Sequence, residues 1–451
     1  MLSGYRELES EKERLSDILR AARRVADEAE VFSLSSPRSV GIQFEANELK
    51  QVQTRESSST ALRIFREGRV GFATASGGGG LEDLVDMAVE SSRFGSPANF
   101  EFPPLQDYSR VSIFDPKVEE IGMEEMVGLG KELIGKVTGH TPGVLCDAEV
   151  ARGTSYVSVI NSRGGEGRYD KTFFSLSLEG ILVQDTDMLF VGDSASSCCP
   201  EFVAVDDLAR KVIRQLEMAK AKATVSAKPL PVVFTPPGVG GVLMSPLILA
   251  FSGKTVVEGA SPLKDRLGEE VFDGRLSLRD DATVAYGVGS YPFDDEGVPG
   301  QSLPLIENGV AANFFYDLQT AASAGTRSTG NGRRAGGSYP RPAISSLVLS
   351  GGDVSFEAMV ADMKEGLIVE QVMGAEQGNI LGGDFGANVL LGYKVENGEI
   401  TGRVKDTMIA GNVYQVLGEL LGIGQEVRWV GGVLQAPCLY CPRISVSTKG
   451  S

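Results

Sequence analysis

The sequence predicts an α+β fold: two N-terminal segments of helix, antiparallel meander and helix, then a glycine-rich mixed β-sheet domain with few helices. Three observations lead to this prediction. Helical and strand periodicities follow one another twice within residues 6–221, glycine dominates the turns from residue 232 onward, and Asn-Gly pairs mark hairpins in the last third. The chain has 451 residues and is 42% hydrophobic, which is enough for two or three domains with cores of their own.

The first segment, residues 1–104, begins with an amphipathic helix, because apolar residues recur at helical spacing over residues 6–29. A periodic helix at 81–94 ends it, and the proline-rich stretch 95–107 is the expected linker. Between the two helices, alternation of apolar and polar residues predicts four strands joined by short turns, at 39–44, 49–55, 60–65 and 69–75.

The middle segment, residues 105–226, repeats this order, which suggests two related α+β layers. Helical spacing predicts helices at 118–137 and 206–221, and a second linker at 223–231 leads out of the segment. Strands are expected between the helices, near 143–149, 155–161, 167–181 and 188–194.

The C-terminal domain, residues 227–451, is predicted to be rich in strands. Asn397-Gly398 and Asn308-Gly309 predict two-residue hairpins, since type I′ turns need positive φ at both central positions. The first hairpin joins strands at 392–396 and 399–404, and the second joins strands at 302–306 and 310–316. Further strands are expected at 344–349 and 388–395, and helices at 239–251, 355–362 and 413–421.

One uncharged stretch, 229–253, is long enough to cross a bilayer of about 30 Å. Its five prolines break any continuous helix, so it is expected to form a strand, a turn and a short helix. The chain opens on a pattern typical of a soluble helix rather than a secretory leader. A soluble, cytoplasmic protein is expected.

Charge and histidine content narrow the function. The 60 acidic and 43 basic side chains give a net charge of −17, which disfavours nucleic acid or an anionic membrane as the main partner. With one histidine in the chain, a site that needs two or three imidazoles from it is excluded.

No complete catalytic constellation is visible. His140 is expected in a loop, and Cys438-Leu-Tyr-Cys441 has no second cysteine pair to complete a four-cysteine zinc site. Ordinary thiols are the favoured interpretation of this pair and of Cys198-Cys199, with zinc binding or redox chemistry as the alternative. Serine-nucleophile, aspartic-protease, dinucleotide and P-loop signatures are incomplete or absent.

Two polar clusters remain as candidates for contact with a substrate or partner. The acidic turn, Asp294-Asp295-Glu296, fits a cation or a peptide amine. The glycine-rich arginine loop, residues 327–341, is a weak candidate for nucleic acid and fits a carboxylate or a peptide C-terminus as well. A solvated loop is the other interpretation of the turn, and a structural role is favoured for Asn331. The candidate residues are Asp294, Asp295, Glu296, Asn331, Arg333 and Arg334.

Six motifs in the C-terminal domain occur in an order that resembles the TldD/PmbA family, whose members are often labelled modulators of DNA gyrase. In the first segment, Gly68-Arg-Val-Gly-Phe-Ala-Thr-Ala75 and the helix at 81–94 are also similar to it. The resemblance covers residues 30–449. The six motifs are Pro292-Phe-Asp-Asp-Glu-Gly-Val298, Pro304-Leu-Ile-Glu-Asn-Gly-Val310, Ser328-Thr-Gly-Asn-Gly-Arg-Arg334, Gly382-Gly-Asp-Phe385, Val395-Glu-Asn-Gly-Glu-Ile400 and Met408-Ile-Ala-Gly-Asn412.

The resemblance implies a three-segment α+β architecture and a role in bacterial or archaeal peptide processing. The family is classed with zinc metallopeptidases, whose TldD-type member carries H-E-x-x-x-H on the helix opening the third segment. Here those ligand positions fall on Met244, Ser245 and Leu249, and the late cysteine ligand falls near Val430-Gly431 rather than on Cys438 or Cys441. The chain therefore resembles the PmbA/TldE type, which lacks the ligands and pairs with TldD.

Three hypotheses follow. The leading one is a PmbA/TldE-type subunit without catalytic residues, metal or cofactor of its own, which dimerises with a zinc-bearing TldD-type partner in the proteolysis of unfolded peptides. The runner-up is an autonomous peptidase with a site rebuilt from His140, Cys438 or Cys441. The third is a standalone peptide-binding homodimer. No direct contact with nucleic acid or membrane is expected, and any effect on gyrase would be indirect.

Overall fold

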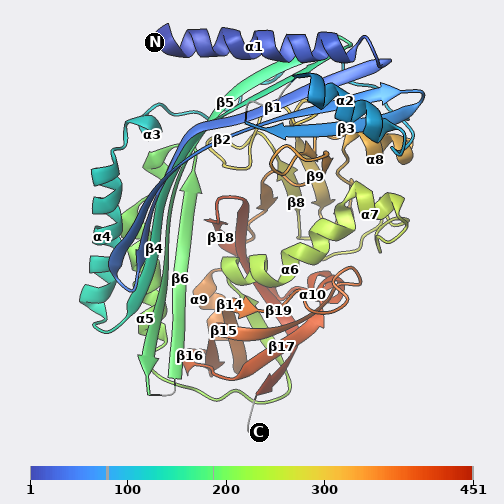
Figure 1. The fold of residues 1–451 in the computed structure, drawn as a ribbon. Helices are drawn as coiled ribbons and strands as arrows, with labels where there is room; N and C mark the ends of the chain where they lie inside the picture. Colours follow the sequence, from blue (N-terminus) through green and yellow to red (C-terminus); the bar gives the residue numbers. More distant parts are fainter. Residues whose placement is uncertain (1, 78–80, 186, 449–451) are drawn as a thin grey trace.

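A computed structural model describes residues 2–77, 81–185 and 187–448 of the chain. Its N-terminal half is one long, curved antiparallel sheet of six strands in the order β3-β2-β1-β4-β5-β6 (Figure 1). The two predicted N-terminal segments supply three strands each, and β1 pairs with β4 to join them. The strands are β1 (Glu28–Glu45), β2 (Glu48–Arg66), β3 (Arg69–Ser76), β4 (Leu145–Asn161), β5 (Glu166–Gln184) and β6 (Asp187–Ser197).

Strand β1 is about three times as long as its predicted strand, and β2 and β4 each merge two predicted strands. The predicted strands at 39–44, 49–55 and 60–65, and those at 143–149 and 155–161, are parts of longer ones. In β1 the register shifts between Ser36 and Ser39, beside Pro37, which marks a bulge. Opposite it runs the serine stretch 57–59 of β2, where no apolar alternation marks a strand although the backbone ladder continues.

Helices cover one face of this sheet. Leu15 and Ile18 of α1 and Leu84 of α2 form a core with the upper ends of β1 and β2, and α4 and α5 cover the lower ends of β1, β4 and β5. The predicted helix over 6–29 ends at Ala22, because Asp27 and Glu28 already pair with Phe65. The predicted helix over 118–137 is two helices. The helices are α1 (Leu2–Ala22), α2 (Leu81–Ser92), α3 (Lys117–Glu120), α4 (Met123–His140), α5 (Val205–Met218) and a short η1 (Pro200–Phe202).

The C-terminal domain is built on an eleven-stranded mixed sheet, so the predicted α+β fold is confirmed. Five of its strands close a ring, because β7 pairs with both β14 and β19. The sequence did not predict β8, β14, β17, β18 or β19, or the short pair formed by β11 and β12. The strands are β7 (Pro229–Phe234), β8 (Leu278–Asp281), β9 (Ser302–Glu307), β10 (Val310–Ala311), β13 (Leu347–Leu349), β14 (Glu365–Met373), β15 (Asp384–Glu396), β16 (Glu399–Arg403), β17 (Thr407–Asn412), β18 (Gly422–Val430) and β19 (Leu434–Thr448), with a separate pair β11 (Gly332–Arg333) and β12 (Arg341–Pro342).

Both predicted Asn-Gly hairpins are present, but the strand predicted at 310–316 is only the two-residue β10. Asn397 and Gly398 have φ of 50° and 81° between β15 and β16, and Asn308 and Gly309 have φ of 49° and 80° between β9 and β10. The predicted helices are confirmed with shifted ends. They are α6 (Pro236–Phe251), α9 (Phe356–Asp362) and α10 (Val413–Gly418), and α7 (Gly253–Val257) and α8 (Leu318–Ser323) accompany them.

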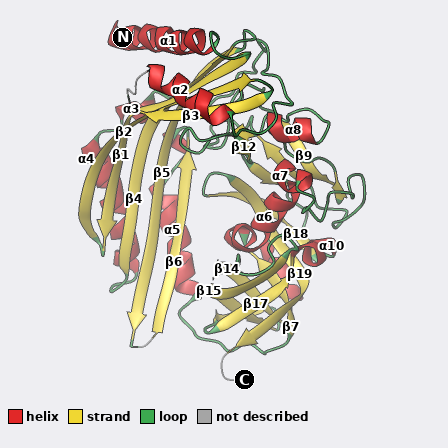
Figure 2. Cartoon of the chain, turned by 45° about the vertical axis from the view of Figure 1, so that its right-hand side comes forward, coloured by secondary structure: helices red, strands yellow, loops and turns green. Residues whose placement is uncertain are grey.

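The C-terminal domain lies on the face of the long sheet opposite the helices. It sits beside β6 and below the end of the sheet that carries α1 and α2 (Figure 2). At the upper end, Phe32, Val159 and Tyr169 of the sheet pack against Tyr291 and Phe293. The edge near α5 shares a second core with β7, β14 and β15. Within the described part of the chain, no helix has the length and apolar character needed to cross a bilayer.

Candidate functional site

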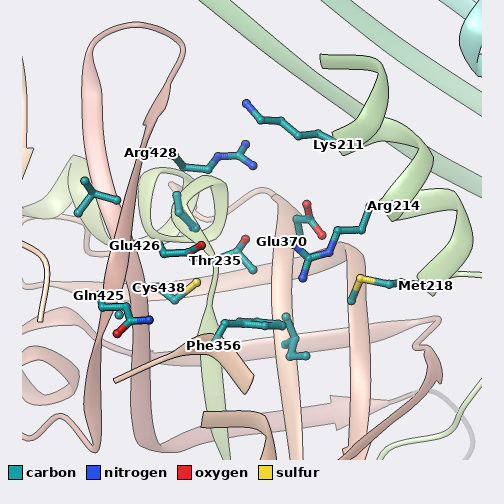
Figure 3. A pocket seen from close by; sticks show the side chains of 14 residues that line it. Lys211, Arg214, Met218, Thr235, Phe356, Glu370, Gln425, Glu426, Arg428 and Cys438 are labelled. Carbon is teal, nitrogen blue, oxygen red and sulfur yellow. The ribbon is translucent and has the colours of Figure 1, made fainter. Parts of the chain in front are cut away.

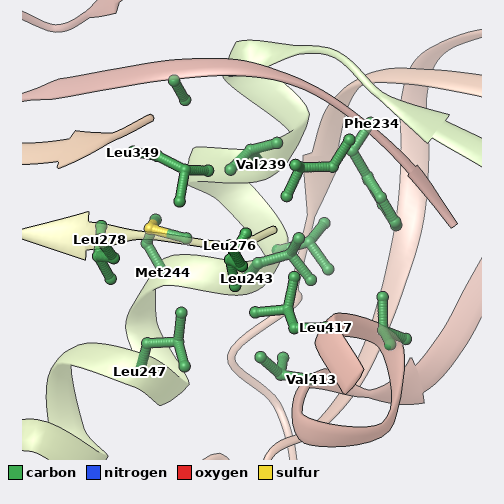
Figure 4. Close-up of a cluster of buried hydrophobic side chains, with 14 of the residues drawn as sticks. Phe234, Val239, Leu243, Met244, Leu247, Leu276, Leu278, Leu349, Val413 and Leu417 are labelled. Carbon is green, nitrogen blue, oxygen red and sulfur yellow. The ribbon is translucent and has the colours of Figure 1, made fainter. Parts of the chain in front are cut away.

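Helix α6 carries the three positions at which the family resemblance places zinc ligands. Thr235 precedes it, and Pro236 and Pro237 begin it with backbone angles that suit a first helical turn. Its interior is almost wholly apolar, and Figure 4 shows Leu243, Met244 and Leu247 surrounded by Leu276, Leu278, Leu349, Val413 and Leu417.

The side chains at these positions do not fit a zinc ion. Met244 is 4% exposed and packed among hydrocarbon side chains, whereas zinc takes thiolate, imidazole or carboxylate ligands. The hydroxyl of Ser245 donates to Glu376 Oε1 at 2.6 Å, and Leu249 lies partly exposed. No group of three or more His, Cys, Asp or Glu suited to a metal occurs among the described residues. No metal-dependent step is therefore derived for this helix.

The remaining reactive side chains of the sequence are scattered. Cys438 and Cys441 lie three residues apart in β19 and so face opposite sides of it, Cys441 in the core around α6 and Cys438 toward α5. Burial raises the pKa of the Cys438 thiol to about 12 and that of Cys198 to about 11, which disfavours the reactive thiolate. His140 is the last residue of α4 rather than a loop residue, and its Nε2 lies 2.5 Å from Glu217 Oε1. The structure brings none of these groups together.

Cys438 lines a cavity of about 170 Å³ between α5 and the C-terminal sheet (Figure 3). Charged side chains enter it from both halves of the molecule. Gln215 of α5 donates to Glu370 Oε1 at 2.9 Å, and burial raises the pKa of Glu370. Arg428 Nη2 donates to Asp193 Oδ2 at 2.7 Å. These contacts join the two halves of the molecule around the cavity.

The acidic turn and the arginine loop meet in space, inside the molecule. Arg63 of β2 donates to Glu296 Oε1 at 2.5 Å and to Glu30 Oε2 at 3.0 Å, with all three side chains fully buried. Arg334 donates to the other oxygen of Glu30, and its backbone N–H donates to Asp295 Oδ2 at 2.7 Å. This buried network ties the long sheet to the C-terminal domain.

The network limits which candidate residues can touch a ligand. Asp294 and Glu296 have no exposed surface, and burial with the neighbouring Glu296 raises the pKa of Asp294 well above its usual range. Asn331 donates to Asp280 Oδ2 at 2.5 Å and to the carbonyl of Ala343, which is the structural role favoured for it. Asp295, Arg333 and Arg334 line a cavity, and of these the Arg333 side chain is 32% exposed, whereas those of Asp295 and Arg334 are 4% and 1% exposed.

This second cavity, of about 400 Å³, lies between the open face of the long sheet and the arginine loop. Arg333 rests over the Tyr291 ring with 4.5 Å from the guanidinium carbon to the ring centre. Lys171, which the sequence did not suggest, also lines it. Its Nζ donates to the carbonyls of Val288 at 2.5 Å and Ser290 at 2.8 Å, and burial lowers its pKa to about 8.

Two family models match the chain: one for the PmbA/TldA metallopeptidase C-terminal domain over residues 227–448, and one for domain 1 of that metallopeptidase over residues 29–92. The metalloprotease PmbA of Escherichia coli O157:H7 is 26% identical over 92% of this chain and 92% of its own length. Two crystal structures share the fold. TldE from Thermococcus kodakarensis has a TM-score of 0.87 at 22% identity, covering 96% of this chain and 100% of its own. A Thermotoga maritima protein described as a modulator of a DNA gyrase has the same score and identity, covering 97% and 100%.

Proposed function

The chain belongs to the PmbA/TldD metallopeptidase family, and we propose that within it this protein is a subunit without zinc, which binds unfolded peptide for a zinc-bearing TldD-type partner. Its own role in proteolysis is then to hold the substrate and complete the complex. Nucleic acid has no part in this role, since the net charge of −17 repels a phosphate backbone.

The observation that carries the proposal is the chemistry of α6. Zinc hydrolysis needs about three ligands and a general base near an open coordination position. Met244 and Leu249 supply no such ligand, and Ser245 supplies no general-base carboxylate. The helix is kept instead as the centre of a hydrophobic core.

Peptide binding is supported by the open face of the long sheet. Three hollows of about 400, 360 and 410 Å³ follow one another along it. The first and second share Phe173 and Ser175, and the second and third share Gln43 and Glu149, so they form one groove. A groove of this length suits an extended chain.

The test combines metal analysis with hydrolysis. The purified chain is expected to contain no stoichiometric zinc and to leave an unfolded peptide intact, and to form a complex with a family member carrying H-E-x-x-x-H that cleaves the peptide unless a chelator is added. One zinc per chain with chelator-sensitive cleavage by the chain alone would establish the autonomous peptidase instead. Peptide binding by a homodimer that forms no complex with any such partner would establish the standalone alternative.

A further inference from the structure

The floor of the groove is a single stripe of β5. Successive side chains of a strand point to opposite faces, so Tyr169, Lys171, Phe173, Ser175, Ser177 and Glu179 share one face. All six line the three hollows. From Lys171 to Glu179 the strand rises roughly 26 Å, which matches an extended peptide of about eight residues.

The two ends of the groove carry opposite charge. Lys171 and Arg333 are the cations of the upper hollow, the cavity of about 400 Å³, where Asp295 is the acidic residue and Arg334 is paired with the buried Glu30. At the lower end the acidic side chains outnumber Lys50, which is itself paired with Glu45 at 3.0 Å. Those acidic side chains are Glu45, Asp147, Glu149 and Glu179.

Arg333 and Lys171 have unused hydrogen-bonding capacity in the upper hollow, whereas Arg334 uses its donors on Glu30, Asp295 and Ser338. Arg333 Nη1 is buried and has no hydrogen-bond partner among the described residues. Its Nε lies 3.6 Å from Asp295 Oδ2, too far for a normal hydrogen bond. Lys171 uses two of its three ammonium protons on backbone carbonyls. An unpaired donor is costly, and because the Arg333 side chain as a whole is 32% exposed, a ligand in the hollow can supply an acceptor to it.

We propose that the upper hollow binds the C-terminal carboxylate of an extended peptide through Arg333 and Lys171. This deepens the proposed function, on which it rests, by assigning the direction of the bound peptide. A carboxylate takes paired N–H donors from a guanidinium, and the apolar walls formed by Leu34, Val157 and Val288 surround the last side chain. The free amine of the peptide then lies toward the acidic end.

The test compares three versions of one peptide of about eight residues of Ala, Ser and Leu: free acid, C-terminal amide, and amide with one internal glutamate. Calorimetry with the full chain should give at least about tenfold tighter binding for the free acid than for either amide, since charge-assisted hydrogen bonds are lost from the amides. Lys171→Gln and Arg333→Gln should each lower the ratio of free-acid to amide affinity.

Arg168→Gln is the matched control, because Arg168 lies on the opposite face of the same strand and contacts Asp170. It should keep the preference. Circular dichroism and thermal melting confirm that each variant is folded. Equal binding of acid and amide would overturn the carboxylate site and leave the peptide-binding role intact. Equal binding of the acid and the glutamate-bearing amide would overturn the assignment to the C-terminus. If no peptide binds the chain or its complex, the proposed function itself fails.

Discussion

Arg63 shows how a single residue fixes the way the two halves of the molecule meet. It stands in the apolar run of β2, where burial would disfavour its charge unless Glu30 and Glu296 were beside it, and their attraction raises its pKa. The sequence shows a lone charge among apolar residues there. It does not show the partners, because Glu296 follows more than two hundred residues later and only the fold brings it close.

Removing one carboxylate from this network should be costly. Glu296→Gln leaves Arg63 buried with half of its counter-charge, so the free energy of unfolding should fall by about 3 kcal/mol. Urea denaturation followed by circular dichroism measures the change. Glu166→Gln is the control, because its ion pair with Lys12 is 53% exposed on the Glu166 side, and it should leave stability unchanged. Similar effects of the two substitutions would contradict this account of the network.

Asp187 predicts a pH-dependent contribution. Burial alone would raise its pKa, but hydrogen bonds from Lys222 and Arg403 and the charge of Arg403 hold it well below its usual range. A depressed pKa stabilises the fold above the unfolded value of about 4 and stops doing so as the pH falls through the folded value. Asp187→Asn should therefore cost about 1 kcal/mol at neutral pH and progressively less below about pH 4. Melting temperatures of both proteins across this range test it, and a constant difference at all pH values would refute it.

The candidate site was only partly predictable at this scale. The acidic turn and the arginine loop were selected from the sequence, but not their mutual contact. Lys171 was missed, because in sequence it is an ordinary lysine of an alternating strand. Its place in the groove depends on the fold, which brings β5 next to the backbone carbonyls of Val288 and Ser290.

At the scale of elements, turns that require particular backbone angles were predictable, whereas the pairing of long strands was not. Asn-Gly hairpins depend on the φ angles of two adjacent residues, which the sequence shows directly. The full lengths of β1 and β2 depend on pairing with each other through polar serines, and β19 depends on neighbours from four different parts of the chain. The spacing of apolar residues within one strand does not show which distant strand it pairs with.

Helix α6 packs closely against β14 at Gly238, where there is no room for a side chain. A Cβ built on Gly238 would stand 2.4 Å from the carbonyl oxygen of Val369, a backbone atom with little freedom to move. Gly135 of α4 has open space at the same position. Gly238→Ala should therefore destabilise the protein by about 2 kcal/mol or more, whereas Gly135→Ala should stabilise it by about 0.5–1 kcal/mol through helix propensity. Chemical denaturation of the two variants gives the comparison, and equal stabilisation by both would show that α6 is not seated this closely.

At the scale of the whole molecule, the two halves share one core. Leu208, Val212 and Leu216 of α5 belong to the same hydrophobic cluster as Ile368 and Tyr393 of the C-terminal domain. The predicted boundary between residues 226 and 227 therefore separates segments of sequence whose buried surfaces cover one another.

Cutting the chain at that boundary should expose this core. Residues 227–451 expressed alone should lack a cooperative thermal transition and should bind a hydrophobic dye, since the apolar surface that faces α5 loses its cover. Coexpression with residues 1–226 should restore one transition and a single complex on size exclusion. A cooperative transition of the isolated C-terminal piece near that of the intact chain would contradict the shared core.

The position of β19 has a consequence for synthesis on the ribosome. It pairs with β7, β13, β17 and β18, so the C-terminal sheet cannot close until residues 434–448 have been translated. At about 5–20 residues per second, β7 waits roughly 10–45 s for this neighbour. The six-stranded N-terminal sheet, whose partners are all translated earlier, can form during that delay and offer its open face to the nascent strands. Chaperone contact during translation is then expected to concentrate on the edges of β7, β13, β17 and β18 that β19 later covers.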